Sequence, residues 1–109
     1  MLNTRLYFAQ RLSAMLMAPL VLIHLATMIY AIQGGLDTAE ILSRTQGSVF
    51  WGSFYGLFVV AASVHAAIGL RVIAHEWLKV AGASLEVLTL VVGIMVLGFG
   101  GRAVIAVVF

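Results

Sequence analysis

The chain has 109 residues, of which 63% are hydrophobic and only 9% are charged, and its formal net charge at pH 7 is +2. This composition is typical of integral membrane proteins, and the basic residues are too scattered to indicate a nucleic-acid partner. Cysteine is absent, which excludes thiolate-bound iron-sulfur clusters, disulfides and covalently attached haem from this chain.

Three apolar stretches are long enough to cross a bilayer, whose hydrocarbon core requires about 20 apolar residues in a helix. They predict an all-α membrane protein with spans at about 12–32, 49–76 and 84–107, within a single transmembrane domain over residues 1–109. These spans leave no room for a soluble domain.

The first span carries one proline and one ionisable residue in its interior. Pro19 predicts a kink, because neighbouring groups in a membrane protein satisfy the carbonyl that proline leaves free. His24 lies deep in the span, whereas Tyr7 and Arg11 lie on a different face near its entrance. At about 100° per residue, the stripe that contains His24 also includes Ser13, Met17, Leu20 and Thr27.

A polar connector over residues 33–48 separates the first two spans. It begins with Gln33-Gly34-Gly35, a helix-stop signal. Asp37 and Glu40 have the spacing of a capping box, which predicts a short interfacial helix. Ser48 then has the position of an N-cap for the second span.

The second span places His65 well inside the hydrocarbon. An ionisable group at that depth is costly without a partner and indicates a functional site, for which a metal is the obvious partner. The neighbours of His65 on its helix face are mostly small, so they leave a shallow groove beside the imidazole: Ala61, Ala62, Ile68 and Gly69. The resulting groove could admit a second helix or a flat macrocycle with iron on the imidazole, and the imidazole favours the macrocycle.

The remaining helical signals concern packing. Gly52-x-x-x-Gly56 in the second span is a close-packing pattern of membrane helices. Ser84 has the position of an N-cap for the third span. Because no ionisable residue lies between Glu86 and Arg102, we interpret the third span as scaffold.

Basic residues at the ends of the spans predict orientation, because Lys and Arg favour the cytoplasmic side. Four fall on one side of the predicted spans: Arg5, Arg11, Arg71 and Lys79. Arg44 and Arg102 fall on the other. We therefore expect a cytoplasmic N-terminus and an external C-terminus, with Tyr7, Arg11 and Ser13 level with Arg71, His75 and Glu76.

Two motifs carry a resemblance to a known family: Arg11-x-Ser13 before the helix with His24, and His65-x-x-x-Gly69-x-Arg71 with an acid at Glu76. They resemble the membrane-anchor, cytochrome b subunits of succinate dehydrogenase and fumarate reductase. The resemblance implies haem b on His65, with Gly69 and Arg71 marking the cytoplasmic end of the helix. It also implies a quinone pocket that includes Arg11 and Ser13, and we expect Arg71 or Tyr7 nearby because quinone reduction needs donors to a carbonyl oxygen. By the same resemblance, the three helices form half of an anchor bundle. A propionate contact for Arg71 follows from the affinity of guanidinium for carboxylate.

The same resemblance implies a role as a subunit that is not catalytic by itself. Its partners would be a flavoprotein that oxidises succinate, an iron-sulfur subunit that passes electrons to quinone, and a second membrane-anchor chain. We expect this assembly in a bacterial or archaeal cytoplasmic membrane. A cytochrome b subunit of another respiratory oxidoreductase and a cofactor-free anchor are the alternative functions.

The depths of the two histidines bear on the number of haems. If Arg11 and Arg71 are level, His24 and His65 differ in depth by about 10 Å at 1.5 Å per residue. One iron cannot comfortably take both imidazoles across that difference. We therefore predict one axial ligand to each of two haems, His24 to the outer and His65 to the inner. A single His65 haem shared with the partner anchor is the alternative.

Overall fold

The computed structural model describes residues 3–109, and within these residues every regular element is a helix. The four helices are α1 (Thr4–Gln33), α2 (Thr38–Thr45), α3 (Val49–Leu78) and α4 (Gly82–Val108). By length and composition, α1, α3 and α4 are long and apolar enough to cross a membrane. The predicted all-α membrane fold with three candidate spans is confirmed.

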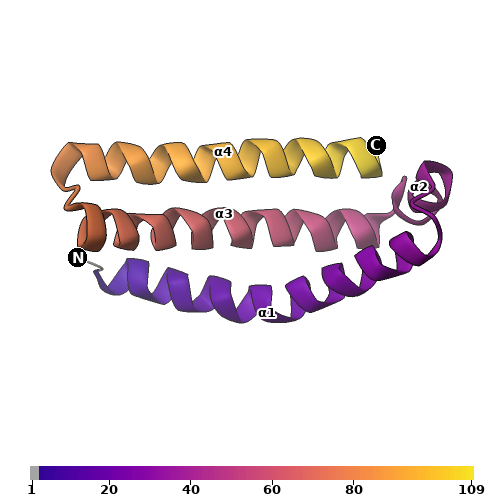
Figure 1. Cartoon of the computed structure of the whole chain (residues 1–109), viewed down its shortest axis with the longest axis horizontal. Helices are drawn as coiled ribbons and strands as arrows, with labels where there is room; N and C mark the ends of the chain where they lie inside the picture. The colour runs from indigo at the N-terminus through magenta and orange to yellow at the C-terminus, as the bar shows by residue number, and fades with distance from the viewer. Residues whose placement is uncertain (1–2) are drawn as a thin grey trace.

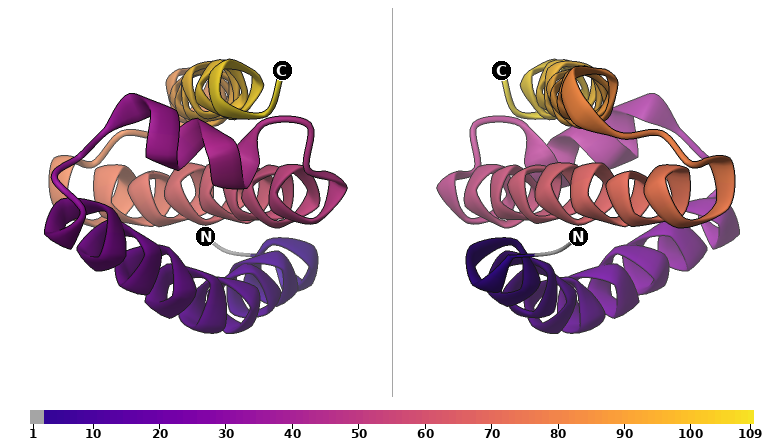
Figure 2. Two further views of the ribbon diagram at one scale, coloured as in Figure 1. Left: turned by 90° about the vertical axis from the view of Figure 1, so that its right-hand side faces the viewer. Right: turned by 90° about the vertical axis from the view of Figure 1, so that its left-hand side faces the viewer.

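Helix α3 lies between the other two long helices, with α1 on one side and α4 on the other (Figure 1). The short helix α2 lies at one end of the molecule and contacts α4. We call this the α2 end; the opposite end, which holds Asn3 and the turn between α3 and α4, is the N-terminal end. Figure 2 shows that α3 is inclined to α4 and that the two halves of α1 form a V.

Helix α1 begins earlier than the predicted span because the Asn3 side chain caps it by accepting a hydrogen bond from the Leu6 amide at 2.8 Å. Its axis bends near the middle of the helix (Figure 1), and Pro19 is the proline inside it, which confirms the predicted kink. Proline lacks an amide hydrogen and its ring clashes with the preceding turn, so the helix opens at that point. The helix ends at Gln33, as the two following glycines predicted.

Side-chain caps begin the next two helices. Asp37 accepts a hydrogen bond from the Ala39 amide at 3.2 Å, and Ser48 accepts one from the Trp51 amide at 3.1 Å. Both predicted N-caps are confirmed. The capping box is incomplete, however, because Glu40 pairs with Arg44 at 2.8 Å.

The predicted cap of the third span is wrong. Helix α4 begins at Gly82, which has φ +65°, and Ala81 precedes it without a side-chain cap. Lys79 adopts the left-handed conformation that turns the chain out of α3, so the new helix starts before Ser84 is reached. Helix α4 then continues without interruption to Val108.

Glycines set the close approach of α3 and α4. A Cβ atom on Gly100 would lie 2.8 Å from Val59 Cγ1, and one on Gly52 would lie 3.3 Å from Val108 Cγ1. A Cβ atom on Gly56 would meet nothing within 4 Å. Half of the predicted Gly52-x-x-x-Gly56 pattern therefore takes part in this packing, while the closest approach is at Gly100.

Candidate functional site

His24 lies on the second half of α1, beyond Pro19, and faces α3. Its ring makes edge contacts with Tyr55 and Phe58, with centroid separations of 5.5 and 5.3 Å. Its Nδ1 atom is buried and has no hydrogen-bond partner within the described residues. A buried polar group without a partner costs about 1–3 kcal/mol, so this imidazole has the character of a binding group.

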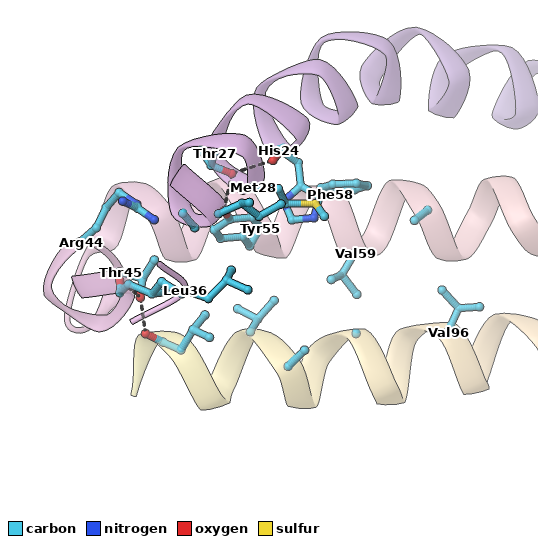
Figure 3. Close-up of a pocket in the computed structure, with 18 residues that line it drawn as sticks. His24, Thr27, Met28, Leu36, Arg44, Thr45, Tyr55, Phe58, Val59 and Val96 are labelled. Atoms are coloured by element: carbon cyan, nitrogen blue, oxygen red, sulfur yellow. Dashed lines mark hydrogen bonds between the residues drawn. The ribbon is translucent and has the colours of Figure 1, made fainter. Parts of the chain in front are cut away.

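A cavity of about 700 Å³ lies beside His24, within the size range of cofactor sites. Figure 3 shows His24 and Met28 of α1 on one side, Tyr55 and Phe58 of α3 behind them, and α4 opposite. The lining is mainly apolar and comes from all four helices. Its members are His24, Thr27, Met28, Ala31, Ile32, Leu36, Ile41, Arg44, Thr45, Tyr55, Phe58, Val59, Ala62, Val96, Gly100, Ala103, Val104 and Val107.

Two polar contacts hold the cavity wall around His24. Thr27 Oγ1 donates to the carbonyl of His24 at 2.7 Å and lies 3.3 Å from the Tyr55 hydroxyl. These contacts join α1 to α3 beside the imidazole, which fixes the position of its helix turn. Periodicity placed Thr27 on the stripe of His24, but the sequence indicated Tyr55 only as an aromatic anchor at the membrane interface and gave no signal for Phe58. Their spacing of three residues puts both on one face of α3.

Helix α2 closes one end of the cavity. Thr45 Oγ1 donates to the carbonyl of Val107 at 2.8 Å, which ties α2 to the end of α4. Arg44 lines the cavity, and its side chain contacts Glu40 at 2.8 Å and the Tyr30 ring at 5.3 Å. Its Nε atom is buried and has no partner in residues 3–109. From the sequence, Arg44 indicated only the orientation of the chain in the membrane.

His65 lies at a different level of the molecule, where it contacts Ser13 of α1. The Ser13 hydroxyl donates to the carbonyl of Gln10 at 2.9 Å and lies 3.3 Å from His65 Nδ1. While the hydroxyl hydrogen is directed to Gln10, Ser13 Oγ can accept a hydrogen bond from the tautomer of His65 that carries its hydrogen on Nδ1. In that tautomer Nε2 carries the lone pair that a metal would use.

The predicted groove beside His65 is filled by α1. Ala61 and Ile68 are each only 4% exposed, and a Cβ atom on Gly69 would lie 3.5 Å from Gln10 Nε2. Of the two occupants that the groove could admit, a helix is the one present. The open volume lies instead beside His24, where Ala62 forms part of the wall.

The contacts between α1 and α3 also correct the predicted register. Because Ser13 meets His65 and Gln10 meets Gly69, Arg11 lies about one helical turn deeper than Arg71. The premise that these two arginines are level is therefore wrong. On the observed register, His24 lies roughly 15 Å from the level of His65, at 1.5 Å per residue along the helices.

Arg71 contacts α4. Its guanidinium donates to Glu86 at 2.7 Å and to Thr89 Oγ1 at 3.3 Å. Arg71 thus already has a carboxylate partner within this chain, and its contact with a haem propionate stays a prediction. Glu76 is exposed, and His75 Nδ1 lies 3.0 Å from the carbonyl of Val80.

Tyr7 and Arg11 lie together on the exposed surface of α1. Arg11 Nη1 donates to the Tyr7 hydroxyl at 3.5 Å, and the guanidinium lies 5.9 Å from the Tyr7 ring centre. Ser13 is buried, with 4% of its surface exposed. The structure therefore brings Tyr7 and Arg11 together but turns Ser13, which was predicted to share a quinone pocket with Arg11, toward His65.

Within residues 3–109, no three His, Cys, Asp or Glu side chains converge into a multidentate metal site. A porphyrin already supplies four nitrogens to its iron, so haem asks the protein only for axial ligands. His24 and His65 are isolated imidazoles on two different helices.

Comparison with known protein families gives a match to the family described as succinate dehydrogenase/fumarate reductase transmembrane subunit, over residues 1–100. No curated protein and no solved structure matches the chain.

Proposed function

The chain belongs to the family of succinate dehydrogenase/fumarate reductase transmembrane subunits, and on that premise we propose that it is a haem b-binding membrane anchor. In this role it would dock the flavoprotein and iron-sulfur subunits and pass electrons to quinone. The proposal depends most on one observation: His24 lines a largely apolar cavity of about 700 Å³ that is formed by all four helices.

The residues present fit a haem. The cavity walls offer apolar contact to a flat macrocycle, and Nε2 is the nitrogen of His24 that can reach iron, because Nδ1 is enclosed. A bound haem would supply a one-electron couple of its iron. Edge contacts from Tyr55 and Phe58 and the helix turn fixed by Thr27 would hold the imidazole in place.

His65 is proposed as the axial ligand of a second haem, nearer to the N-terminal end. Metal-bound histidines typically donate their other ring hydrogen to a fixed acceptor, and Ser13 Oγ is such an acceptor. Since α1 covers the face around Ala61 and Ile68, this haem would lie against another side of α3. A second anchor chain would form the rest of that site and complete both axial ligand sets.

The quinone site is proposed at the N-terminal end, around Arg11 and Tyr7. Quinone reduction requires hydrogen-bond donors to a carbonyl oxygen and a source of protons. The paired guanidinium and phenol offer both kinds of donor at the exposed surface of α1. The iron-sulfur subunit would dock at this end, on the cytoplasmic face of a bacterial or archaeal membrane.

A test uses the complex purified from its membrane. We expect a b-type band in its reduced-minus-oxidised spectrum, and we expect His24→Ala and His65→Ala each to lose a different component of the haem redox titration. Val64→Ala, at an exposed position on α3, is a matched control that should retain both components. Retention of all haem by His24→Ala would contradict the assignment of the cavity, and absence of any haem would favour a cofactor-free anchor.

A further inference from the structure

We infer that Arg44 binds the anionic edge of the molecule in the His24 cavity and that this anion is a haem propionate. The inference rests on the proposed haem-binding function. It assigns an orientation to the ligand, with its carboxylates toward the α2 end, and gives helix α2 a role in setting the redox potential.

The first argument is charge. Among the lining residues of the described chain, Arg44 is the one with a formal charge, and it lies in the helix that closes the cavity. The lining of α4 extends from Val96 to Val107, roughly 16 Å at 1.5 Å per residue, so the cavity is elongated with Arg44 at one end. An apolar body with an anionic end complements such a site.

The second argument is hydrogen-bonding capacity. A guanidinium has five N–H donors, and Glu40 accepts from Nη1 at 2.8 Å. Nε is buried without a partner, although the side chain as a whole retains 22% exposure. An added carboxylate at Arg44 would satisfy buried donors and would share the positive charge with Glu40.

Haem propionates and lipid phosphates are both anions on apolar bodies, and His24 favours the first. A haem would engage both His24, through Nε2, and Arg44 with one molecule, whereas a lipid offers no ligand contact to the imidazole.

The test measures the midpoint potential of the haem that His24→Ala removes, in the purified complex. Arg44→Gln removes a positive charge beside the propionate and should shift the reduction equilibrium about tenfold toward the oxidised form, about 59 mV lower for one electron. Arg44→Lys should retain most of the wild-type potential. Glu40→Gln should raise the potential, because it removes the competing carboxylate while leaving the guanidinium in place.

The opposite signs of the two potential shifts distinguish a charge effect from a structural effect. Arg44→Gln and Glu40→Gln both break the same ion pair, so a folding defect would shift the potential in the same direction in both variants. Arg102→Gln, an exposed arginine of α4 outside the cavity lining, is the matched control and should not shift the potential.

Several results would overturn the inference. If Arg44→Gln behaves like Arg102→Gln while His24→Ala still loses its haem, the propionate contact is wrong and the haem site stands. If Arg44→Gln leaves the potential unchanged but loses co-purified phospholipid, the anion is a lipid phosphate. If His24→Ala loses no haem, both the inference and the assignment of the cavity are wrong.

Discussion

The hydroxyl of Ser13 lies 3.3 Å from Nδ1 of His65 and joins α1 to α3 at the level of that histidine. When the same hydroxyl donates to Gln10, it can accept from the tautomer of His65 that carries its hydrogen on Nδ1 and leaves Nε2 free. Ser13 therefore contacts His65, the proposed haem ligand. It does not lie on the exposed surface that holds Tyr7 and Arg11.

Ser13→Ala should weaken haem binding at His65 by about tenfold to a hundredfold, the effect usual for losing an outer-shell partner of a metal ligand. Ser13→Thr keeps a hydroxyl and should restore most of the affinity. Haem content and the potential of the His65 component measure the effect. A changed KM for quinone with unchanged haem would instead return Ser13 to the quinone pocket.

Arg11→Ala should lower quinone reductase activity, because it removes a charged donor from the proposed pocket, while succinate oxidation with a soluble dye continues. Removing a hydrogen bond to a charged group typically costs about 1.5–3 kcal/mol, or roughly tenfold to a hundredfold in quinone kcat/KM. Arg5→Ala, on the same helix and also exposed, is the control. Equal activities in the two variants would place the pocket elsewhere.

The predicted topology places Phe109 outside the membrane, because four of the six basic residues lie toward the N-terminal end. A reporter that is active only in an external compartment should therefore work when fused after Phe109. A reporter that requires the cytoplasm should work when fused before Met1. The opposite pattern would reverse the proposed docking face for the iron-sulfur subunit.

Gly100→Ala should destabilise the protein, because its Cβ atom would lie 2.8 Å from Val59 Cγ1, and β-branched valine has little freedom to move in a helix. Overpacking of this kind typically costs about 1–3 kcal/mol. The thermal midpoint of the complex in detergent measures the loss.

Gly101→Ala is the matched control for this packing, since a Cβ atom there meets nothing within 4 Å. It should preserve or raise the midpoint, because alanine favours helix more than glycine does. The double variant Gly100→Ala with Val59→Ala should recover much of the loss. Equal midpoints for Gly100→Ala and Gly101→Ala would show that α4 can move away from α3.

The sequence by itself determined the helices and most of their ends. Apolar length predicts the spans, Pro19 the bend, and Asp37 and Ser48 the caps, because each of these effects depends on residues within a few positions along the chain. Periodicity along α1 also placed Ser13 and His24 on one stripe, and both face α3.

Only the tertiary structure decided which residues meet across helices. The site of the cavity, the ion pair of Arg71 with Glu86 and the contact of Gly100 with Val59 depend on the register and inclination of neighbouring helices. Local periodicity specifies a face but not the level of a partner, so Arg11 and Arg71 were placed about one turn out of register. For the same reason, the sequence could not predict that α2 closes the cavity and brings Arg44 into the same candidate site as His24.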